Sequence, residues 1–233
     1  MEAIGTLAGG IAHDFNNILG SVIGYTELAN MAVKDENISR YLEQVLQASD
    51  RARTLVAQIL TFSRQSRQEK KPLSVTPISK EVIKLLRSSI PANIQIRQNF
   101  TCPYDTIYAD PTQIYQVLMN LCTNAAHAMR EDGGQLEISL ESENIPTAGM
   151  VYAHDLKAGA YLKLMVRDTG CGMDPSIMEH IFEPFFTTKK EGEGTGLGLS
   201  VVYGIVKDHG GSIHVASQPE KGTAFTIHLQ IGR

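Results

Sequence analysis

Two apolar stripes in the first 62 residues place the strongest constraint on what this chain can fold into. In the first stripe, apolar side chains recur every three or four residues from Ile4 to Ala32, which is the period of a helix with one buried face. A second stripe runs from Leu42 to Phe62, and the polar residues 34–37 between them predict a turn. Two helices with so short a link form an antiparallel hairpin.

A lone hairpin cannot bury an apolar stripe on each of its helices. Two copies of the chain solve this by pairing as a four-helix bundle, so we expect a homodimer. The chain of 233 residues is long enough for a second domain, and its 42% hydrophobic content can supply a separate core.

Composition excludes several classes of function. The formal charge of −4 gives no general attraction to nucleic acid or anionic lipid. Three cysteines without a CxxC spacing indicate neither a disulfide framework nor a zinc site. Because no apolar run approaches the roughly 18 residues of a membrane span and no signal-peptide pattern is present, we expect a cytoplasmic location without direct membrane contact.

The first stripe passes through the polar sequence HDFNN, whose residue types are poor helix formers. His13 lies between the stripe positions Ile11 and Phe15, and Asn17 lies one turn further along the same face. Asp14 follows His13 directly in the sequence. These residues alone leave two interpretations open, namely a solvated polar cluster and a functional site.

The chain becomes polar and basic after residue 65, with prolines at positions 72 and 77. This change predicts three parts: a helical hairpin over 1–70, a linker over 71–76 and a second domain over 77–233. In the second domain, helix patterns cover 77–89 and 111–129, the latter opened by Asp110 as N-cap. Strand patterns cover residues 94–100, 106–110, 135–141, 160–168, 212–217 and 224–229. This order favours a two-layer α/β sandwich with helices on one face of a mixed sheet.

Three segments of the second domain could bind a ligand. Asn120 and Asn124 lie on one face of an apolar helix, with His127 three residues further on, which suits either a hydrated Mg²⁺ or a helix–sheet hydrogen-bond pair. Asp168 ends an apolar strand before two glycines and suits either ligand binding or an Asx turn. The run GEGTGLGLS opens a helix with amides free of side chains, which is typical of an anion site but matches neither a P-loop nor a Rossmann fingerprint.

Taken in order, the motifs resemble the transmitter core of a two-component sensor histidine kinase. AHDFNN resembles its H box, NLCTNAAHAM its N box, DTGCGM its first glycine box, IFEPFFTTK its phenylalanine box and GEGTGLGLS its second glycine box. HDFNN is similar to the variant in nitrogen-regulation-type and hybrid kinases and departs from the commoner H box, in which Glu follows the His.

The resemblance implies a dimeric phosphoacceptor hairpin joined to an ATP-binding sandwich of the gyrase and histidine-kinase superfamily. It makes His13 the nucleophile, with Asp14 holding the other ring nitrogen and Asn17 serving a phosphatase activity. It makes Asn124 a ligand of Mg²⁺, and the polypeptide from Phe182 to Gly194 a mobile lid anchored by Phe185 or Phe186. The residues assigned to nucleotide binding are Asn120, Asn124, His127, Asp168, Gly170, Gly172, Phe185, Lys189, Gly194, Gly196, Leu197, Gly198 and Thr223.

The implied reaction is a phosphorelay. ATP phosphorylates His13, and the phosphoryl group passes to an aspartate of a response-regulator receiver domain, under a sensor domain that we expect upstream of these residues. Related ATPases carry a glutamate where this chain has Asn120, and an amide cannot activate water as a base. The alternatives are a nucleotide-gated ATPase or dimer clamp like the gyrase members, and a degenerate core that only binds and dimerises.

Overall fold

The structure is a computed structural model of the chain and describes residues 18–46, 48–49, 69–146, 156–189 and 194–232. The chain divides into two compact units. The first unit takes Met1–Gln68 with Lys189–Thr195, and the second takes Glu69–Thr188 with Gly196–Arg233.

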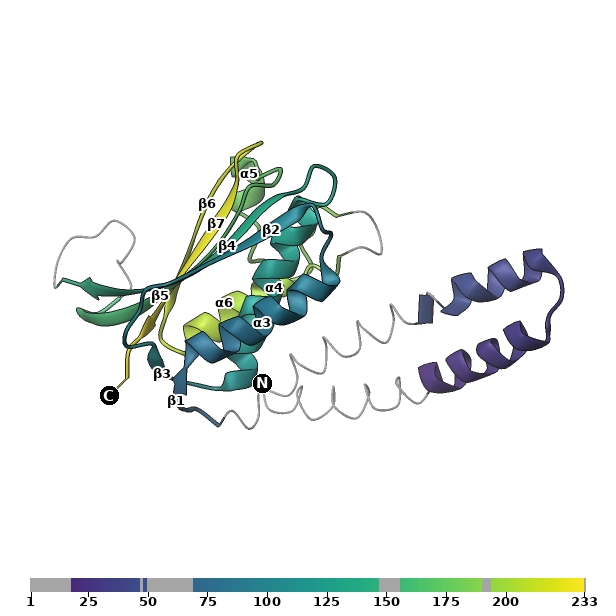
Figure 1. Cartoon of the computed structure of the whole chain (residues 1–233), viewed down its shortest axis with the longest axis horizontal. Coiled ribbons are helices and arrows are strands. Elements are labelled where there is room, and N and C mark those ends of the chain that lie inside the picture. Colours follow the sequence, from purple (N-terminus) through teal and green to yellow (C-terminus); the bar gives the residue numbers. More distant parts are fainter. Residues whose placement is uncertain (1–17, 47, 50–68, 147–155, 190–193, 233) are drawn as a thin grey trace. The chain divides into compact units, whose positions relative to one another are not determined.

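The first unit contains a hairpin of two helices, residues 18–32 and 36–46, which run antiparallel (Figure 1). The Ser39 hydroxyl on the second helix donates a hydrogen bond of 2.8 Å to the side-chain oxygen of Asn30 on the first. This bond joins positions on the two helices and supports the hairpin predicted from the two apolar stripes.

The turn of the hairpin is shorter than the four residues, 34–37, that the sequence predicts. The Asp35 carboxylate accepts hydrogen bonds from the backbone N–H groups of Asn37 and Ile38, at 2.8 and 3.3 Å. Asp35 is therefore the N-cap of the second helix, and the helix starts at position 36 because this side chain satisfies two of its free N–H groups.

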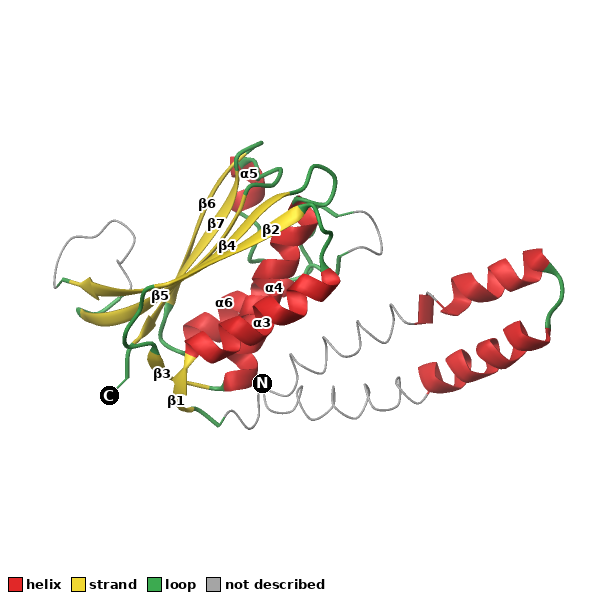
Figure 2. Ribbon diagram, viewed as in Figure 1, coloured by secondary structure: helices red, strands yellow, loops and turns green. Residues whose placement is uncertain are grey.

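The second unit is built on a five-stranded mixed sheet with strand order β2-β4-β5-β7-β6 (Figure 2). Only the β2–β4 pair is parallel in this sheet, and the other neighbours are antiparallel. The strands are β2 (Ile94–Phe100), β4 (Gly134–Ile145), β5 (Gly159–Asp168), β6 (Ser212–Gln218) and β7 (Gly222–Gln230).

Three helices cover one face of this sheet: α3 (Val75–Ser89), α4 (Pro111–Ala128) and α6 (Gly198–Asp208) (Figure 2). A single-turn helix, α5 (Pro175–Met178), lies in the connection between β5 and α6. Among the described residues, no helix has both the length and the apolar character needed to cross a membrane. The predicted two-layer architecture of the second domain is confirmed.

The core lies between the helices and the sheet because the strands alternate apolar and polar side chains. Nine apolar side chains on the covered face of the three central strands are at most 6% exposed. They are Leu136, Ile138, Leu140, Leu162, Leu164, Val166, Phe225, Ile227 and Leu229.

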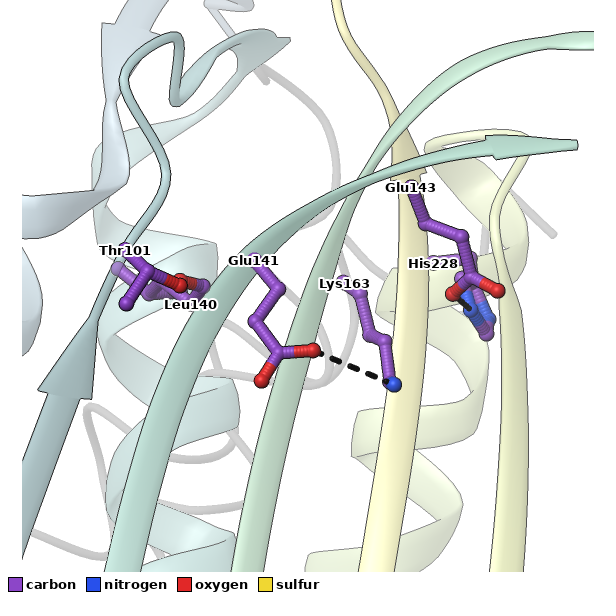
Figure 3. A network of polar contacts seen from close by, with 6 residues as sticks. All are labelled: Thr101, Leu140, Glu141, Glu143, Lys163 and His228. Carbon is purple, nitrogen blue, oxygen red and sulfur yellow. Dashed lines mark hydrogen bonds and ion pairs between the residues drawn. The ribbon is translucent and has the colours of Figure 1, made fainter.

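The opposite face of the sheet carries paired polar side chains instead (Figure 3). Lys163 on β5 lies 3.4 Å from a carboxylate oxygen of Glu141 on β4. His228 on β7 lies 3.0 Å from Glu143. The strand period of two thus separates the core from a polar outer face.

The residues 71–76, predicted as a linker, instead belong to the second unit. They form β1 (Lys71–Ser74) and the start of α3, two residues earlier than the helix that the sequence predicts at 77. β1 pairs antiparallel with β3 (Thr106–Ala109) in a separate two-stranded sheet. Pairing with a strand more than thirty residues away is a long-range contact that local composition does not report.

Candidate nucleotide site

The buried carboxylate of Asp168, at the end of β5, is one centre of the candidate site. Asp168 is 4% exposed, and its Oδ1 accepts hydrogen bonds from the backbone N–H groups of Gly170 at 2.9 Å and Thr223 at 3.2 Å. Burial raises the pKa of this carboxyl, and the two backbone hydrogen bonds oppose that shift. Within the described residues no hydrogen bond to Oδ2 is found, so this oxygen can accept one from a ligand.

The loop after Asp168 is held by contacts that require glycine. A Cβ on Gly170 would lie 2.6 Å from the Ala128 carbonyl oxygen at the end of α4. A Cβ on Gly172, whose φ is +66°, would overlap the Gln218 carbonyl on β6. Because the loop lies directly against helix α4 and the β6–β7 hairpin, no larger residue fits at either position.

Asn120 and Asn124, predicted to share one face of α4, both lie beside the first residue of α6. The Asn120 amide donates a hydrogen bond of 3.3 Å to the Gly198 carbonyl oxygen. A Cβ built on Gly198 would lie 3.8 Å from Asn120 and 3.9 Å from Asn124. The structure therefore brings both amides to the start of α6, which the sequence alone predicts only as an anion site.

In the part of the chain that the structure describes, the N-terminus of α6 has no side-chain capping bond. Its N-cap residue is Leu197, whose side chain cannot accept a hydrogen bond from the first turn. Free N–H groups at the start of an eleven-residue helix favour an anion, and here two carboxamides stand next to them. This combination suits the phosphate groups of a nucleotide.

Gly196 joins the start of α6 to the segment around Phe185. The Phe185 N–H donates to the Gly196 carbonyl oxygen at 3.0 Å, and any Cβ on Gly196 would overlap the Phe185 backbone. Phe185 itself has a φ of +69° and is 74% exposed, whereas Phe186 packs against the core. Of the two phenylalanines predicted as anchor, the structure therefore favours Phe186.

The remaining predicted residues are placed as follows. His127 is half-buried on the last turn of α4, and Thr223 lies on β7 against Asp168. Lys189 and Gly194 are half-buried on either side of 190–193, which lie outside the described residues. His13, Asp14 and Asn17 also lie outside them, so their roles stay predictions.

The sequence interpretation missed Ser217 on β6. Its hydroxyl accepts a hydrogen bond from the Met173 N–H at 2.9 Å and lies 2.9 Å from the Thr223 hydroxyl. No local signal identified it, because its contacts depend on the register of the β6–β7 hairpin, which pairs Ser217 with Thr223.

The donor set fits a nucleotide with a magnesium ion. Mg²⁺ takes oxygen ligands and usually keeps phosphate and water oxygens, so one or two neutral amide oxygens suffice from the protein. Among the described residues there is no group of three or more His, Cys, Asp or Glu side chains that could hold a metal ion by themselves. A cation here would therefore depend on the nucleotide for most of its ligands.

Comparison with known families agrees with this geometry. Residues 109–233 match the family described as histidine kinase-, DNA gyrase B- and HSP90-like ATPase, and residues 3–68 match the His Kinase A (phospho-acceptor) domain. The chain belongs to the histidine kinase family.

Individual relatives match nearly the whole chain. Sensor kinase CckA of Brucella abortus is 41% identical over 98% of this chain, and the signal transduction histidine-protein kinase AtoS of Escherichia coli is 32% identical over 99%. The chain spans only 24% of CckA and 35% of AtoS.

Solved structures show the same fold. Histidine kinase ThkA in complex with the response regulator protein TrrA has a TM-score of 0.64 and 26% identity, covering 98% of this chain and 62% of that one. Full-length ShkA in complex with AMPPNP has a TM-score of 0.73 and 23% identity, covering 96% and 45%. The sequence-based assignment to sensor histidine kinases is confirmed.

Proposed function

We propose that this chain is an ATP-dependent histidine autokinase in which His13 accepts the γ-phosphoryl group. The observation that carries the proposal is the pair of carboxamides, Asn120 and Asn124, beside the uncapped start of α6. This arrangement can bind phosphates, but an amide at position 120 cannot take a proton from water. The pocket would hold ATP intact and deliver its phosphoryl group to another acceptor.

His13 supplies that acceptor. A neutral ring nitrogen of His13 forms the new bond to the γ-phosphorus while the bond to the bridging oxygen breaks and ADP leaves. Asp14 would hold the other ring nitrogen and its proton. Positioning and electrostatic stabilisation supply most of the rate in phosphoryl transfer, and here the α6 amides would contribute both.

Adenine would bind at Asp168, whose Oδ2 can accept a hydrogen bond from the amino group. Mg²⁺ would bind Asn124 through its side-chain oxygen, with Asn120 in support. It would neutralise charge on the phosphates. The segment from Phe182 to Gly194 would act as the lid, based on the Phe185–Gly196 hydrogen bond.

The exposed apolar side chains of the first unit indicate its first partner, a second copy of the chain. Eight large apolar side chains of the described hairpin are at least 38% exposed, which supports burial against a second copy in a four-helix bundle. They are Ile18, Val22, Tyr25, Leu28, Met31, Ile38, Tyr41 and Val45. A response-regulator receiver domain would then take the phosphoryl group from His13, as the ThkA–TrrA complex suggests for a relative.

The test is incubation of the full chain with γ-labelled ATP. We expect label on the wild type in an acid-labile, base-stable form, none on His13→Ala, and none on Asn124→Ala even at raised Mg²⁺. His13→Ala should still bind ATP with unchanged affinity, since the two matched domains are separate. His214→Ala, a substitution of the same kind on β6, should keep the label. Label on His13→Ala would contradict the proposal.

The gyrase-like alternative predicts steady release of phosphate from ATP without labelled protein. The amide at position 120 opposes it for the reason given above. Measuring phosphate release in the same samples separates the two functions, because an autokinase without a receiver stops after one phosphoryl group per histidine.

A further inference from the structure

A row of three polar side chains closes the apolar core at one end of the sheet. Residues opposite each other in antiparallel strands point to the same face. Arg167 pairs with Ala224, so the next residues, Asp168 and Thr223, are opposite each other, and Thr223 pairs with Ser217. Asp168, Thr223 and Ser217 therefore continue the apolar rows of β5, β7 and β6 on the helix-covered face.

The Ser217 hydroxyl is the centre of the hydrogen bonds in this row. It accepts from the Met173 N–H at 2.9 Å and donates to the Gly222 carbonyl oxygen at 3.1 Å. It also lies 2.9 Å from the Thr223 hydroxyl oxygen. These three bonds connect the loop after Asp168 with both strands of the β6–β7 hairpin.

Either hydroxyl could be the donor in the Ser217–Thr223 bond, and the Gly222 carbonyl favours one direction. A serine hydroxyl has one proton, and a carbonyl oxygen can only accept. When the Ser217 proton bonds the Gly222 carbonyl, the Thr223 hydroxyl must donate to Ser217. The Thr223 oxygen then presents only lone pairs to any neighbour.

Thr223 and Asp168 are opposite each other on the same face of neighbouring strands, and the Thr223 N–H donates to Asp168 Oδ1. With Thr223 donating to Ser217, both side chains offer acceptors and no donor on this face of the candidate site. An amino group at position 6 of a purine has two N–H donors and matches such a pair. A carbonyl at the same position is an acceptor and is repelled.

We propose that Ser217 is a positioning residue for base specificity, which it exerts by holding the Thr223 hydroxyl as an acceptor. This inference rests on the proposed function, in which Asp168 binds adenine. Without the Ser217 hydroxyl, Thr223 is free to rotate and to donate its proton to a carbonyl at position 6. The site then loses the part of its discrimination between 6-amino and 6-oxo purines that Thr223 supplies, and keeps the part that Asp168 supplies.

The test compares binding of ADP and inosine diphosphate to the full chain by calorimetry. The two nucleotides differ only at position 6 and the adjacent ring nitrogen, and neither supports phosphorylation of the protein. Ser217→Ala should lower the preference for ADP about tenfold, the equivalent of one hydrogen bond. Ser217→Thr keeps a hydroxyl and should retain most of the preference.

Ser212→Ala is the matched control. Ser212 lies on the same strand and is 9% exposed, but its hydroxyl has no hydrogen-bond partner among the described residues, and it faces the other side of the sheet. Its substitution should leave the ADP preference unchanged. A change as large as that of Ser217→Ala would overturn the inference.

Thr223→Val supplies a second, independent arm. If Ser217 acts through the Thr223 hydroxyl, the valine variant already lacks the part of the preference that depends on Thr223, and adding Ser217→Ala changes the ratio of affinities no further. A Ser217→Ala variant that weakens both nucleotides equally has only a structural role, which overturns the inference. Wild-type chain that binds neither nucleotide overturns the proposed function itself.

Discussion

At the scale of single residues, Asp168 combines near-complete burial with the proposed role of accepting a hydrogen bond from adenine. A buried carboxylate loses hydration, and the two backbone N–H groups that reach Oδ1 replace only part of it. A ligand that donates to the second oxygen would replace more. Under the proposed function, adenine binding would therefore recover part of the hydration that the Asp168 carboxylate loses on folding.

This arrangement predicts a pH dependence of nucleotide binding. Because burial raises the pKa of the Asp168 carboxyl, it is still protonated at a pH where an exposed aspartate is ionised. ADP affinity should rise with pH as the carboxyl ionises and become constant above the folded pKa. Asp168→Asn should weaken ADP binding by about 1–3 kcal/mol and remove this dependence. Calorimetric titration of both proteins across acidic pH measures it.

The same raised pKa gives the free energy of unfolding a pH dependence of opposite sign to that of ADP affinity. In the nucleotide-free chain, a raised pKa means that the folded state binds the proton more tightly than the unfolded state. Its contribution to the free energy of unfolding is complete below the ordinary value and is lost as pH rises through the folded pKa. An ADP affinity that falls with rising pH would contradict the role of Asp168 as acceptor.

At the scale of elements, helix α3 begins where a distant side chain satisfies its first turn. Its N-cap residue, Ser74, makes no capping bond to the helix. Instead the Asp105 carboxylate accepts from the Thr76 N–H and, at 2.8 Å, from the Ser74 hydroxyl. The start of α3 and the approach to β3 thereby depend on each other.

Asp105→Ala should lower the free energy of unfolding of the chain by about 1 kcal/mol, the typical value of an N-cap. Burial alone would raise the pKa of Asp105, but hydrogen bonds from Thr76 and Ser74 hold it below its ordinary 3.8. This stabilisation is present above 3.8 and is lost as pH falls through the folded pKa. Urea unfolding at neutral and acidic pH measures both effects.

Asp174→Ala is the control for Asp105. Asp174 is the N-cap residue of α5, but its side chain makes no capping hydrogen bond. The same substitution there should change the free energy of unfolding little. Equal losses for the two variants would remove the capping role from Asp105.

The exposed stripe of the hairpin predicts a dimer that one charge can disrupt. Tyr25 is 76% exposed and lies on the first apolar stripe. Tyr25→Glu should shift the chain from dimer to monomer in sedimentation or light scattering, because it would bury a carboxylate in the bundle. Glu27→Gln, about 200° further round the helix at 3.6 residues per turn, should leave the dimer intact. A dimer that tolerates Tyr25→Glu would place the interface elsewhere.

At the scale of the whole molecule, the proposed reaction needs residues from both units. The nucleotide residues from Asn120 to Thr223 belong almost entirely to the second unit, whereas the acceptor His13 belongs to the first. Under the proposed function, neither unit would carry out the phosphorylation of His13 by itself. Binding of ATP and transfer to histidine can be separated by substitutions in one unit at a time.

In the first unit, we expect substitution of Asn17 to separate the kinase activity from the phosphatase activity. Asn17→Ala should leave phosphorylation of His13 unchanged, because the amide has no chemical part in attack by the imidazole. It should slow dephosphorylation of a phosphorylated receiver domain, because a carboxamide can orient the attacking water by accepting and donating hydrogen bonds. The decay rate of the labelled receiver measures this.

Asn16→Ala, the same substitution one position earlier and about 100° round the helix at 3.6 residues per turn, serves as the control. It should retain both activities. Equal decay rates for Asn17→Ala and wild type, or equal losses in phosphorylation and decay, would return Asn17 to a structural role.

The sequence by itself determined the elements whose signals are local. The period of the apolar stripes predicted the hairpin, and the period of two predicted the strands β4 to β7. Asp110 with the following proline marked the start of α4, and its side chain does accept from the Thr112 N–H at 2.8 Å. Such signals depend on neighbours within a few residues, so the sequence contains them directly.

Only the tertiary structure decided the features that join distant segments. The capping of α3 by Asp105, the strand β1 within the predicted linker and the bonds of Ser217 all pair residues that local propensity cannot relate. The choice of Phe186 over Phe185 also required the fold, because both are aromatic and adjacent, and only packing distinguishes them. Long-range contacts form where the whole core brings two surfaces together, and no local pattern encodes that position.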